Sequence, residues 1–293
     1  MLKIRKSIDI NQDTNYTFNN KINKVFYKSN LDMYFIKHED FRKGDAMEDI
    51  KLRVEGIEKS FPGVKALSNI SFAVRRGTVH ALCGENGAGK STLMKILTGL
   101  YKADAGQIYI DEKPVEIRNP IQAREYGISM IAQELNYVSE LSVEENLFMG
   151  RLPTGRFGKV DWKKVRSEAV RFLKEENLTY APDQKLKTLT VSDIQMLEII
   201  KAITNNASVV LMDEPTSALD PCNRRIVIDT IRDMGQTRII TSHDLDMILD
   251  TCDRVILISD GRIAADGKAA DILSDRTLLE ANRMELPLSM SRR

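Results

Sequence analysis

From residue 51 onward, short apolar runs of strand length alternate with stretches in which apolar residues recur every three or four positions. Short runs rich in Val, Ile and Leu are typical of strands buried in a sheet. The predicted strands cover residues 51–54, 70–74, 78–83, 107–110, 128–132, 209–212, 238–241 and 254–258. Asp260 and Gly261 then form a two-residue turn signal, so residues 262–265 are expected to pair back as a hairpin. The pattern as a whole predicts an α/β fold.

Between residues 133 and 206 the pattern becomes mostly helical. Apolar residues recur at helical spacing in residues 143–147, 162–178 and 193–203. We therefore expect residues 133–205 to form a helical subdomain that is inserted into an α/β core. The core itself is expected to comprise residues 47–132 and 206–293.

Residues 1–46 differ in composition from the rest of the chain. They are rich in Asn, Lys and Asp and lack a sustained hydrophobic period, which predicts a poorly ordered extension. Aromatic residues such as Tyr34, Phe35 and Phe41 leave open that this extension packs on another surface. Met47 is an alternative start of the natural chain.

Composition and charge narrow the class of protein. Lys and Arg total 43 against 42 Asp and Glu, so the net charge is +1 and no global field favours nucleic acid as a partner. The apolar runs fall far short of the about 20 residues that a membrane helix needs. A polar run at residues 11–20 stands where a signal peptide would be apolar. Cys83, Cys222 and Cys252 are too scattered for a disulfide framework or a metal-ligand cluster. These features indicate a cytoplasmic protein.

Residues 84–91 carry the most specific motif of the chain. They read Gly-Glu-Asn-Gly-Ala-Gly-Lys-Ser, which fits G-x-x-x-x-G-K-[S/T], between the strand 78–83 and a helical pattern at 92–100. The glycines let successive N–H groups turn toward one anion, and the helix adds the positive end of its dipole. Lys90 is expected to reach the outer phosphates of a nucleoside triphosphate, and Ser91 to hold Mg²⁺. The expected phosphate-binding residues are Gly84, Asn86, Gly87, Ala88, Gly89, Lys90, Ser91 and Thr92.

Two carboxylates end the apolar strand 209–212. Asp213 is expected to coordinate Mg²⁺, through water, and Glu214 to accept a proton from the water that attacks the γ-phosphate. Alone, this pattern is also that of a solvated strand end. His243, after the strand 238–241, and Gln133, after the strand 128–132, are equally unspecific when each is considered alone.

Taken in order, these motifs resemble those of the ATP-binding cassette (ABC) transporter ATPases. The series comprises residues 84–91, Gln133, residues 189–195, Asp213-Glu214, residues 217–220 and His243. The resemblance covers about residues 51–288. It implies a P-loop NTPase core of the ABC ATPase type, α/β in class, with an inserted helical subdomain that carries a signature motif. It also implies ATP and Mg²⁺ as the cofactors.

The resemblance assigns roles to single residues. Phe61 is similar to the aromatic residue that stacks on adenine, whereas by itself it reads as a core Phe before a turn. Gln133 matches the hinge that senses Mg²⁺ and the transmembrane partner. Glu214 matches the catalytic base, His243 the γ-phosphate switch, and Asp220 the residue that communicates between paired sites. The metal-binding residues implied are Ser91, Gln133 and Asp213.

The signature motif departs from the family pattern. Family members usually write it Leu-Ser-Gly-Gly-Gln, and residues 189–193 read Leu-Thr-Val-Ser-Asp. Thr190 preserves the hydroxyl, but Ser192 stands where a glycine lets backbone amides approach the γ-phosphate bound by the opposing subunit. Asp193 brings negative charge toward that phosphate, partly offset because it begins a helix. We expect Thr190 and Ser192 to contact ATP and the ATPase activity to be reduced rather than abolished.

The resemblance to particular importers changes along the chain. About residues 51–216 are similar to the first cassette of ribose- and galactose-type sugar importers, which usually carry two cassettes where this chain carries one. About residues 213–291 are more similar to the single-cassette ATPases of cobalt- or nickel-type energy-coupling-factor importers. The function implied is ATP binding and hydrolysis that drive uptake of a small solute, with a monosaccharide as the expected cargo.

Such a subunit implies several partners at the cytoplasmic face of the cell membrane. These are transmembrane permease subunits, a second ATPase subunit in a homo- or heterodimer, and a solute-binding component, with no nucleic acid. One alternative is the ATPase of a cobalt- or nickel-type importer. A second is a hydrolytically weak regulatory ATP-binding module, which Ser192 motivates. A third, a non-transport cassette protein of the translation-factor or DNA-repair kind, calls for a second cassette or a long coiled coil, and the sequence has neither.

Overall fold

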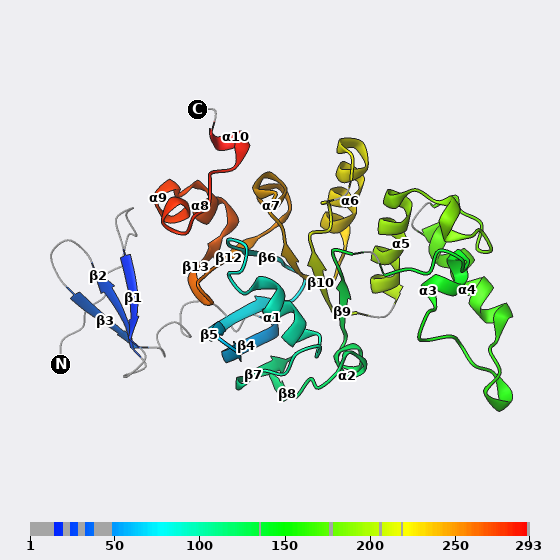
Figure 1. The fold of residues 1–293 in the computed structure, drawn as a ribbon, viewed down its shortest axis with the longest axis horizontal. Coiled ribbons are helices and arrows are strands. Elements are labelled where there is room, and N and C mark those ends of the chain that lie inside the picture. Colours follow the sequence, from blue (N-terminus) through cyan, green and yellow to red (C-terminus); the bar gives the residue numbers. More distant parts are fainter. Residues whose placement is uncertain are drawn as a thin grey trace. The chain divides into compact units, whose positions relative to one another are not determined.

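The computed structural model describes two compact units, residues 1–49 and 50–293 (Figure 1). In the first unit it describes only the backbone of three strands and Asp49. In the second it describes residues 50–134, 136–175, 178–204, 207–217 and 219–291.

The described part of the first unit is a three-stranded antiparallel sheet. Strands β1 (Asn15–Asn19), β2 (Lys24–Lys28) and β3 (Met33–Lys37) pair in sequence order. Aromatic and β-branched residues, which favour strands, recur in these segments. The sequence analysis did not predict them, because each is short and the Asn and Lys around them obscure the period. The expected poor order of the other residues in 1–46 lies outside the described residues.

The larger unit is built on a six-stranded sheet with the order β13-β12-β6-β11-β10-β9. Its strands are β6 (Val79–Cys83), β9 (Ile128–Ile131), β10 (Val209–Asp213), β11 (Thr237–Thr241), β12 (Arg254–Ser259) and β13 (Arg262–Lys268). All run parallel except β13, which returns antiparallel on β12. Asp260 and Gly261 both have positive φ, 46° and 71°, as the predicted hairpin turn requires. The hairpin is therefore confirmed.

A second, antiparallel sheet has the order β5-β4-β7-β8. Its strands are β4 (Ile50–Phe61), β5 (Val64–Arg75), β7 (Ala105–Ile110) and β8 (Lys113–Val115). β4 and β5 are longer than predicted, and their pairing is interrupted by register shifts that break the alternation of apolar residues. β8 has no apolar run and was not predicted.

Helices cover both faces of the parallel sheet (Figure 1). Alternate side chains of its strands enter separate cores: Val210 and Met212 pack in one cluster, and Val209 and Leu211 in the other. The second cluster also holds α1 (Lys90–Leu97) and the apolar residues of the antiparallel sheet. The remaining helices are α2 (Pro120–Glu125), α3 (Val143–Leu147), α4 (Trp162–Glu175), α5 (Val191–Thr204), α6 (Pro221–Asp233), α7 (Leu245–Thr251), α8 (Ala269–Ser274), α9 (Arg276–Ala281) and α10 (Leu288–Ser291), with single 3-10 turns at Arg156–Gly158 and Leu186–Thr188.

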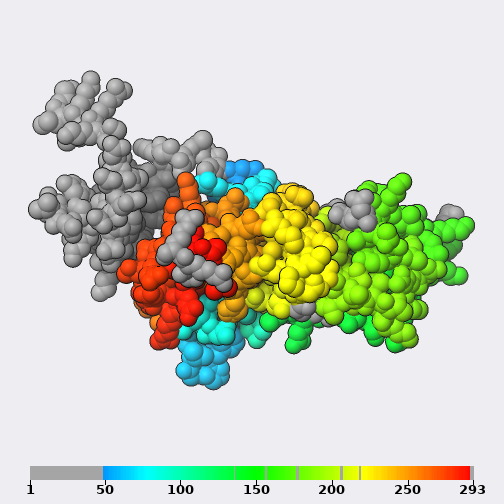
Figure 2. All heavy atoms as spheres, turned by 90° about the horizontal axis from the view of Figure 1, so that it is seen from above, coloured from blue at the N-terminus to red at the C-terminus, as the bar shows by residue number. Residues whose placement is uncertain are grey.

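Helices α3, α4 and α5 gather at one end of the larger unit, where Figure 2 shows their green atoms together. The predicted helices at 143–147, 162–178 and 193–203 correspond to these three. The division into a core and a helical subdomain at residues 133 and 205 stays a prediction. Among the described residues, none of the helices is both long enough and apolar enough to cross a membrane.

Candidate nucleotide site

The parallel sheet brings the predicted motifs to one edge. Carboxyl ends of parallel strands meet at the same edge of a sheet, and here β6, β11, β10 and β9 are successive neighbours. The motif 84–91 follows β6 and His243 follows β11. Asp213 ends β10, with Glu214 directly after it, and Gln133 follows β9. Motifs that are far apart in the sequence therefore lie along the same edge of the sheet.

Two glycines of the loop 84–91 are required by its shape. Gly84 has φ +145°, and a Cβ there would lie 2.1 Å from the carbonyl oxygen of Ile258. Gly89 has φ +110°, and its Cβ would lie 2.6 Å from Leu67 Cδ2. Neither position accepts a side chain without a shift of the backbone packed against it.

Backbone hydrogen bonds fix the same loop to its neighbours. Gly261 N–H donates to the Ala88 carbonyl at 3.1 Å, and Ser68 N–H donates to the Gly261 carbonyl at 2.8 Å. The β12–β13 turn thus ties the loop to strand β5. These hydrogen bonds hold the loop 84–91 in its conformation.

The amino-terminal end of α1 faces this loop. Gly89 is the N-cap residue and has no side chain to accept from the first turn. The first N–H groups of a helix have no partner within the helix, and the helix dipole adds positive potential there. Asn86 and Gly87 are exposed, Ser91 is exposed at the start of the helix, and Thr92 is half-buried. This end of the helix fits a phosphate group.

Lys90 connects the loop to the acidic strand end. Its ammonium group is largely buried and donates to the carbonyl oxygens of Gly84 at 2.7 Å and Glu85 at 3.0 Å. Burial lowers the pKa of Lys90, and the negative charges of Glu214 and Asp213 oppose that shift. The ammonium group therefore lies within the field of both carboxylates, at the edge where a phosphate would bind.

Glu214 has a strained backbone and a largely but not fully buried carboxylate. Its φ is +47°, uncommon for a residue with a side chain, and its N–H donates to the Thr241 carbonyl at 3.0 Å. The Oε2 atom accepts from Ser242 Oγ at 3.4 Å and from the His243 N–H at 3.3 Å, and Oε1 lies 3.6 Å from His243 Nε2. Burial raises the pKa of Glu214. A carboxylate with a raised pKa is a better proton acceptor than an ordinary one.

The oxygen-rich donor set fits Mg²⁺. Magnesium prefers carboxylate, hydroxyl and amide oxygens, and Asp213, Ser91 and Gln133 offer these groups. One Asp213 oxygen accepts a hydrogen bond from the Thr241 hydroxyl on the neighbouring strand, which leaves its other oxygen for a ligand. Gln133 is exposed, after edge strand β9.

The signature segment lies elsewhere in the chain. Residues 189–193 lead into α5, which Figure 1 shows apart from α1. Thr190 and Asp193 form a capping box: the Thr190 N–H and hydroxyl donate to Asp193 Oδ2 at 2.9 and 2.7 Å, and the Asp193 N–H donates back at 3.3 Å. Tyr180 donates to Asp193 Oδ1 at 2.6 Å. Burial acts to raise the pKa of Asp193, but these hydrogen bonds lower it overall.

This geometry gives Asp193 a local role as well. Its carboxylate accepts hydrogen bonds from Tyr180 and Thr190 of its own chain, and the expected effect of its charge on a phosphate of an opposing subunit stays a prediction. The T-x-x-D spacing is a capping signature that sequence reasoning could have used. Ser192 is exposed, with its hydroxyl 2.9 Å from that of Thr190. Asp220 likewise caps α6, accepting from the N–H groups of Cys222 and Asn223 at 3.0 and 3.1 Å.

Phe61 ends strand β4 with a half-buried ring. The ring meets Tyr101 edge to face, with centroids 5.4 Å apart and an interplanar angle of 68°. Lys59 Nζ lies 5.5 Å from its centroid. Because the ring is not fully buried, part of it is available to a planar ligand.

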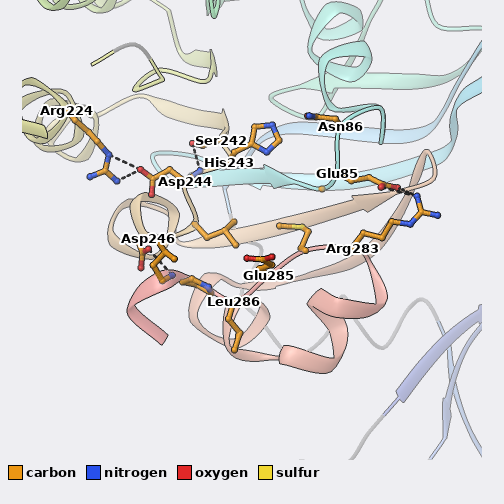
Figure 3. A pocket seen from close by; sticks show the side chains of 15 residues that line it. Glu85, Asn86, Arg224, Ser242, His243, Asp244, Asp246, Arg283, Glu285 and Leu286 are labelled. Carbon is orange, nitrogen blue, oxygen red and sulfur yellow. Dashed lines mark hydrogen bonds and ion pairs between the residues drawn. The ribbon is translucent and has the colours of Figure 1, made fainter. Parts of the chain in front are cut away.

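A cavity of about 780 Å³ borders the loop and His243. Figure 3 shows His243 and Asn86 along one wall, and Glu285 and Leu286 of the carboxyl-terminal segment along the other. Arg283 Nη1 lies 3.0 Å from both carboxylate oxygens of Glu85. Asp246 accepts from the N–H groups of Leu288 and Ser289 at 3.0 and 3.1 Å. Sequence reasoning missed these contacts because no local pattern links segments so far apart.

A family model described as "ABC transporter" matches residues 67–217. The ribose import ATP-binding protein RbsA of Caldanaerobacter subterraneus is 44% identical over 232 residues, which are 78% of this chain and 47% of that protein. The xylose import ATP-binding protein XylG of Geobacillus kaustophilus is 44% identical over 222 residues, 74% of this chain and 44% of that protein. The chain thus spans slightly less than half the length of these relatives.

Solved structures show the same fold. A nucleotide-free ATP-binding cassette from an ABC transporter superposes with a TM-score of 0.70 at 29% identity, over 79% of this chain and 98% of that one. The cbiO1 protein of Clostridium perfringens, part of the transporter complex cbiONQ, gives 0.67 at 26% identity, over 80% and 94%. The predicted α/β fold class, with a P-loop NTPase core, is confirmed.

Proposed function

Because the chain belongs to the ABC transporter family, we propose that it is the ATP-binding and ATP-hydrolysing subunit of an importer for a small solute. The observation that carries the proposal is the position of Lys90. It is buried between the carbonyl groups of the loop 84–91 and lies in the field of Asp213 and Glu214. A triphosphate on the loop would thus have its outer phosphates beside a cation and a proton-accepting carboxylate.

The chain's own groups divide the work of binding. N–H groups of residues 87–92 would bind the inner phosphates, Lys90 the outer ones, and Phe61 would stack on the adenine. Ser91 and Asp213 would hold Mg²⁺, with Gln133 completing the set. When bound there, the ion would neutralise charge on the outer phosphates.

Glu214 and His243 would act on the γ-phosphate side. Glu214 would orient the attacking water and accept its proton, which the raised pKa of its largely buried carboxylate favours. The half-exposed His243 ring, 3.6 Å from Glu214 Oε1, would contact the γ-phosphate and respond to its loss.

Two chains would pair head to tail. The amino-terminal end of α5, with Thr190 and Ser192, would close over ATP held by the other chain. ATP at 100 times its dissociation constant supplies about 2.7 kcal/mol per site. Two sites give about 5.4 kcal/mol, comparable to the about 5.5 kcal/mol that moves an equilibrium from 1:99 to 99:1. ATP binding can therefore drive closure of permease subunits at the cytoplasmic face of the membrane. In this proposal, residues 133–205 form the helical subdomain.

A monosaccharide is the proposed cargo, taken up with a solute-binding component. The relatives named above import ribose and xylose, and a galactose/methyl galactoside import protein of Clostridium perfringens is 42% identical over 228 residues. The resemblance of about residues 213–291 to cobalt- or nickel-type ATPases keeps such an importer as the second candidate.

Steady-state ATP turnover tests the proposal. The wild-type chain should hydrolyse ATP, and Glu214→Gln should abolish turnover while it retains ATP binding. ATP binding without turnover, even in membranes that contain the permease, would instead support a regulatory ATP-binding module, as Ser192 in the signature segment suggests.

A further inference from the structure

The residues just before Phe61 are clipped to the loop that follows α1. Asp104 Oδ2 accepts from the Ser60 N–H at 2.6 Å, and Oδ1 accepts from Lys59 Nζ at 2.8 Å. The Asp104 N–H in turn donates to the Glu58 carbonyl at 2.9 Å. One carboxylate and its own backbone therefore fix three successive residues of β4, directly before the aromatic ring.

Tyr101 supports the ring itself. Its edge-to-face contact with Phe61, at 5.4 Å between centroids, lies within the favourable range for aromatic pairs. The Tyr101 N–H donates to the Lys95 carbonyl at 3.0 Å, and Lys95 Nζ lies 5.4 Å from the Tyr101 centroid. Tyr101 is thus anchored to the last turn of α1.

The same helix therefore reaches both parts of the proposed site. It begins at Lys90, beside the phosphate loop, and its carboxyl-terminal loop holds Phe61 through Tyr101 and Asp104. Strand β5, the partner of β4, packs Leu67 against the position of Gly89 at the other end of the helix. The β4–β5 hairpin thus contacts both ends of α1. These contacts fix the position of Phe61 relative to the loop 84–91.

We infer that Asp104 and Tyr101 are positioning residues, which hold Phe61 in place to stack on the nucleobase. The inference rests on the proposed function, in which the ligand is ATP. Without Asp104, the Ser60 N–H and the Lys59 ammonium group lose their partner, and the end of β4 samples other conformations. ATP then has to order Phe61 on binding, which lowers its affinity. Contacts to the phosphates are unaffected, because Asp104 follows the far end of α1.

The test compares ATP with inorganic tripolyphosphate, which has phosphates but no base, by calorimetry on the full chain. We expect Phe61→Ala to weaken ATP binding about tenfold, since the nucleobase loses the aromatic ring on which it stacks. Asp104→Ala should weaken it about three- to tenfold and leave tripolyphosphate affinity unchanged. Tyr101→Ala should have the same effect as Asp104→Ala. Tyr101→Phe, which keeps the ring, should bind ATP with wild-type affinity.

A double variant separates positioning from general stability. In the Phe61→Ala background, Asp104→Ala should have no further effect on ATP affinity, because the ring that it positions is gone. Glu116→Ala is the matched control, since Glu116 is an exposed carboxylate paired with Arg118 at 2.6 Å. It should change neither affinity. If Asp104→Ala fails to fold, the Tyr101 series provides the same comparison.

The inference is overturned, while ATP binding stands, by additive effects of Asp104→Ala and Phe61→Ala or by equal weakening of ATP and tripolyphosphate by Asp104→Ala. Wild-type ATP affinity in Phe61→Ala would overturn it as well. A folded wild-type chain that binds neither ligand would refute the proposed function instead.

Discussion

Replacing Lys90 with alanine removes a cation that lies between the loop and the acidic strand end. In the structure its ammonium group is bound by two carbonyl oxygens, at 2.7 and 3.0 Å. At an effective dielectric constant near 20, a unit charge about 4 Å from a phosphate charge contributes about 4 kcal/mol. Part of that gain is offset because contacts with the carbonyl oxygens weaken. We therefore expect ATP binding to weaken by about 1.5–3 kcal/mol, or about 10- to 150-fold.

The fold should tolerate this change. The lost hydrogen bonds are compensated because a buried charge no longer has to be desolvated, so the free energy of unfolding should change by about 1 kcal/mol or less. Calorimetric titration with Mg·ATP measures the affinity, and urea denaturation measures the stability. Lys113→Ala, an exposed lysine on β8, is the control and should change neither. Unchanged ATP affinity in a folded Lys90→Ala chain would refute the assigned site.

Three further predictions concern packing, acid stability and turnover. Gly89→Ala places a Cβ 2.6 Å from Leu67 Cδ2 at φ +110°, so urea denaturation should show a loss of about 1–3 kcal/mol, and an unchanged midpoint would contradict the required geometry. Burial lowers the pKa of His80 from 6.5 to about 4, so the ring is neutral in the folded chain above about pH 4. Stability should therefore fall as pH drops from about 6.5 toward 4, by up to about 3 kcal/mol, and His80→Leu should flatten this slope in pH-dependent denaturation. Ser192→Gly restores the glycine of the family signature and should raise ATP turnover severalfold, whereas lower turnover would show that the serine hydroxyl is used.

Local patterns predicted much of the larger unit. A few neighbouring residues are enough to predict strand β10 at Val209–Asp213 and the turn at Asp260 and Gly261. Both depend on local features: a short apolar run in the first case and residues that accept positive φ in the second. A parallel sheet also brings the residues that follow its strands to one edge, so the sequence predicted that these motifs lie close together. This is why Lys90 and Glu214, far apart in the chain, act on each other electrostatically.

Contacts between distant segments were beyond sequence reasoning. Asp104 holds Ser60 across 44 residues, and Arg283 pairs with Glu85 across 198. An exposed carboxylate or guanidinium group has many possible partners, and only the folded chain selects one. Asp193 shows the opposite case: its partner Thr190 lies three residues away, so the T-x-x-D spacing alone could have predicted this helix cap.

The central claim is that the backbone around Ala88 surrounds a triphosphate whose terminal group faces Glu214. A crystal structure of the Glu214→Gln chain with Mg·ATP tests it directly. We predict phosphates on the N–H groups at the start of α1, the Lys90 ammonium group on the outer phosphates, and residue 214 beside the γ-phosphate. A nucleotide bound elsewhere, or a side chain at position 214 turned away from the γ-phosphate, would contradict the account.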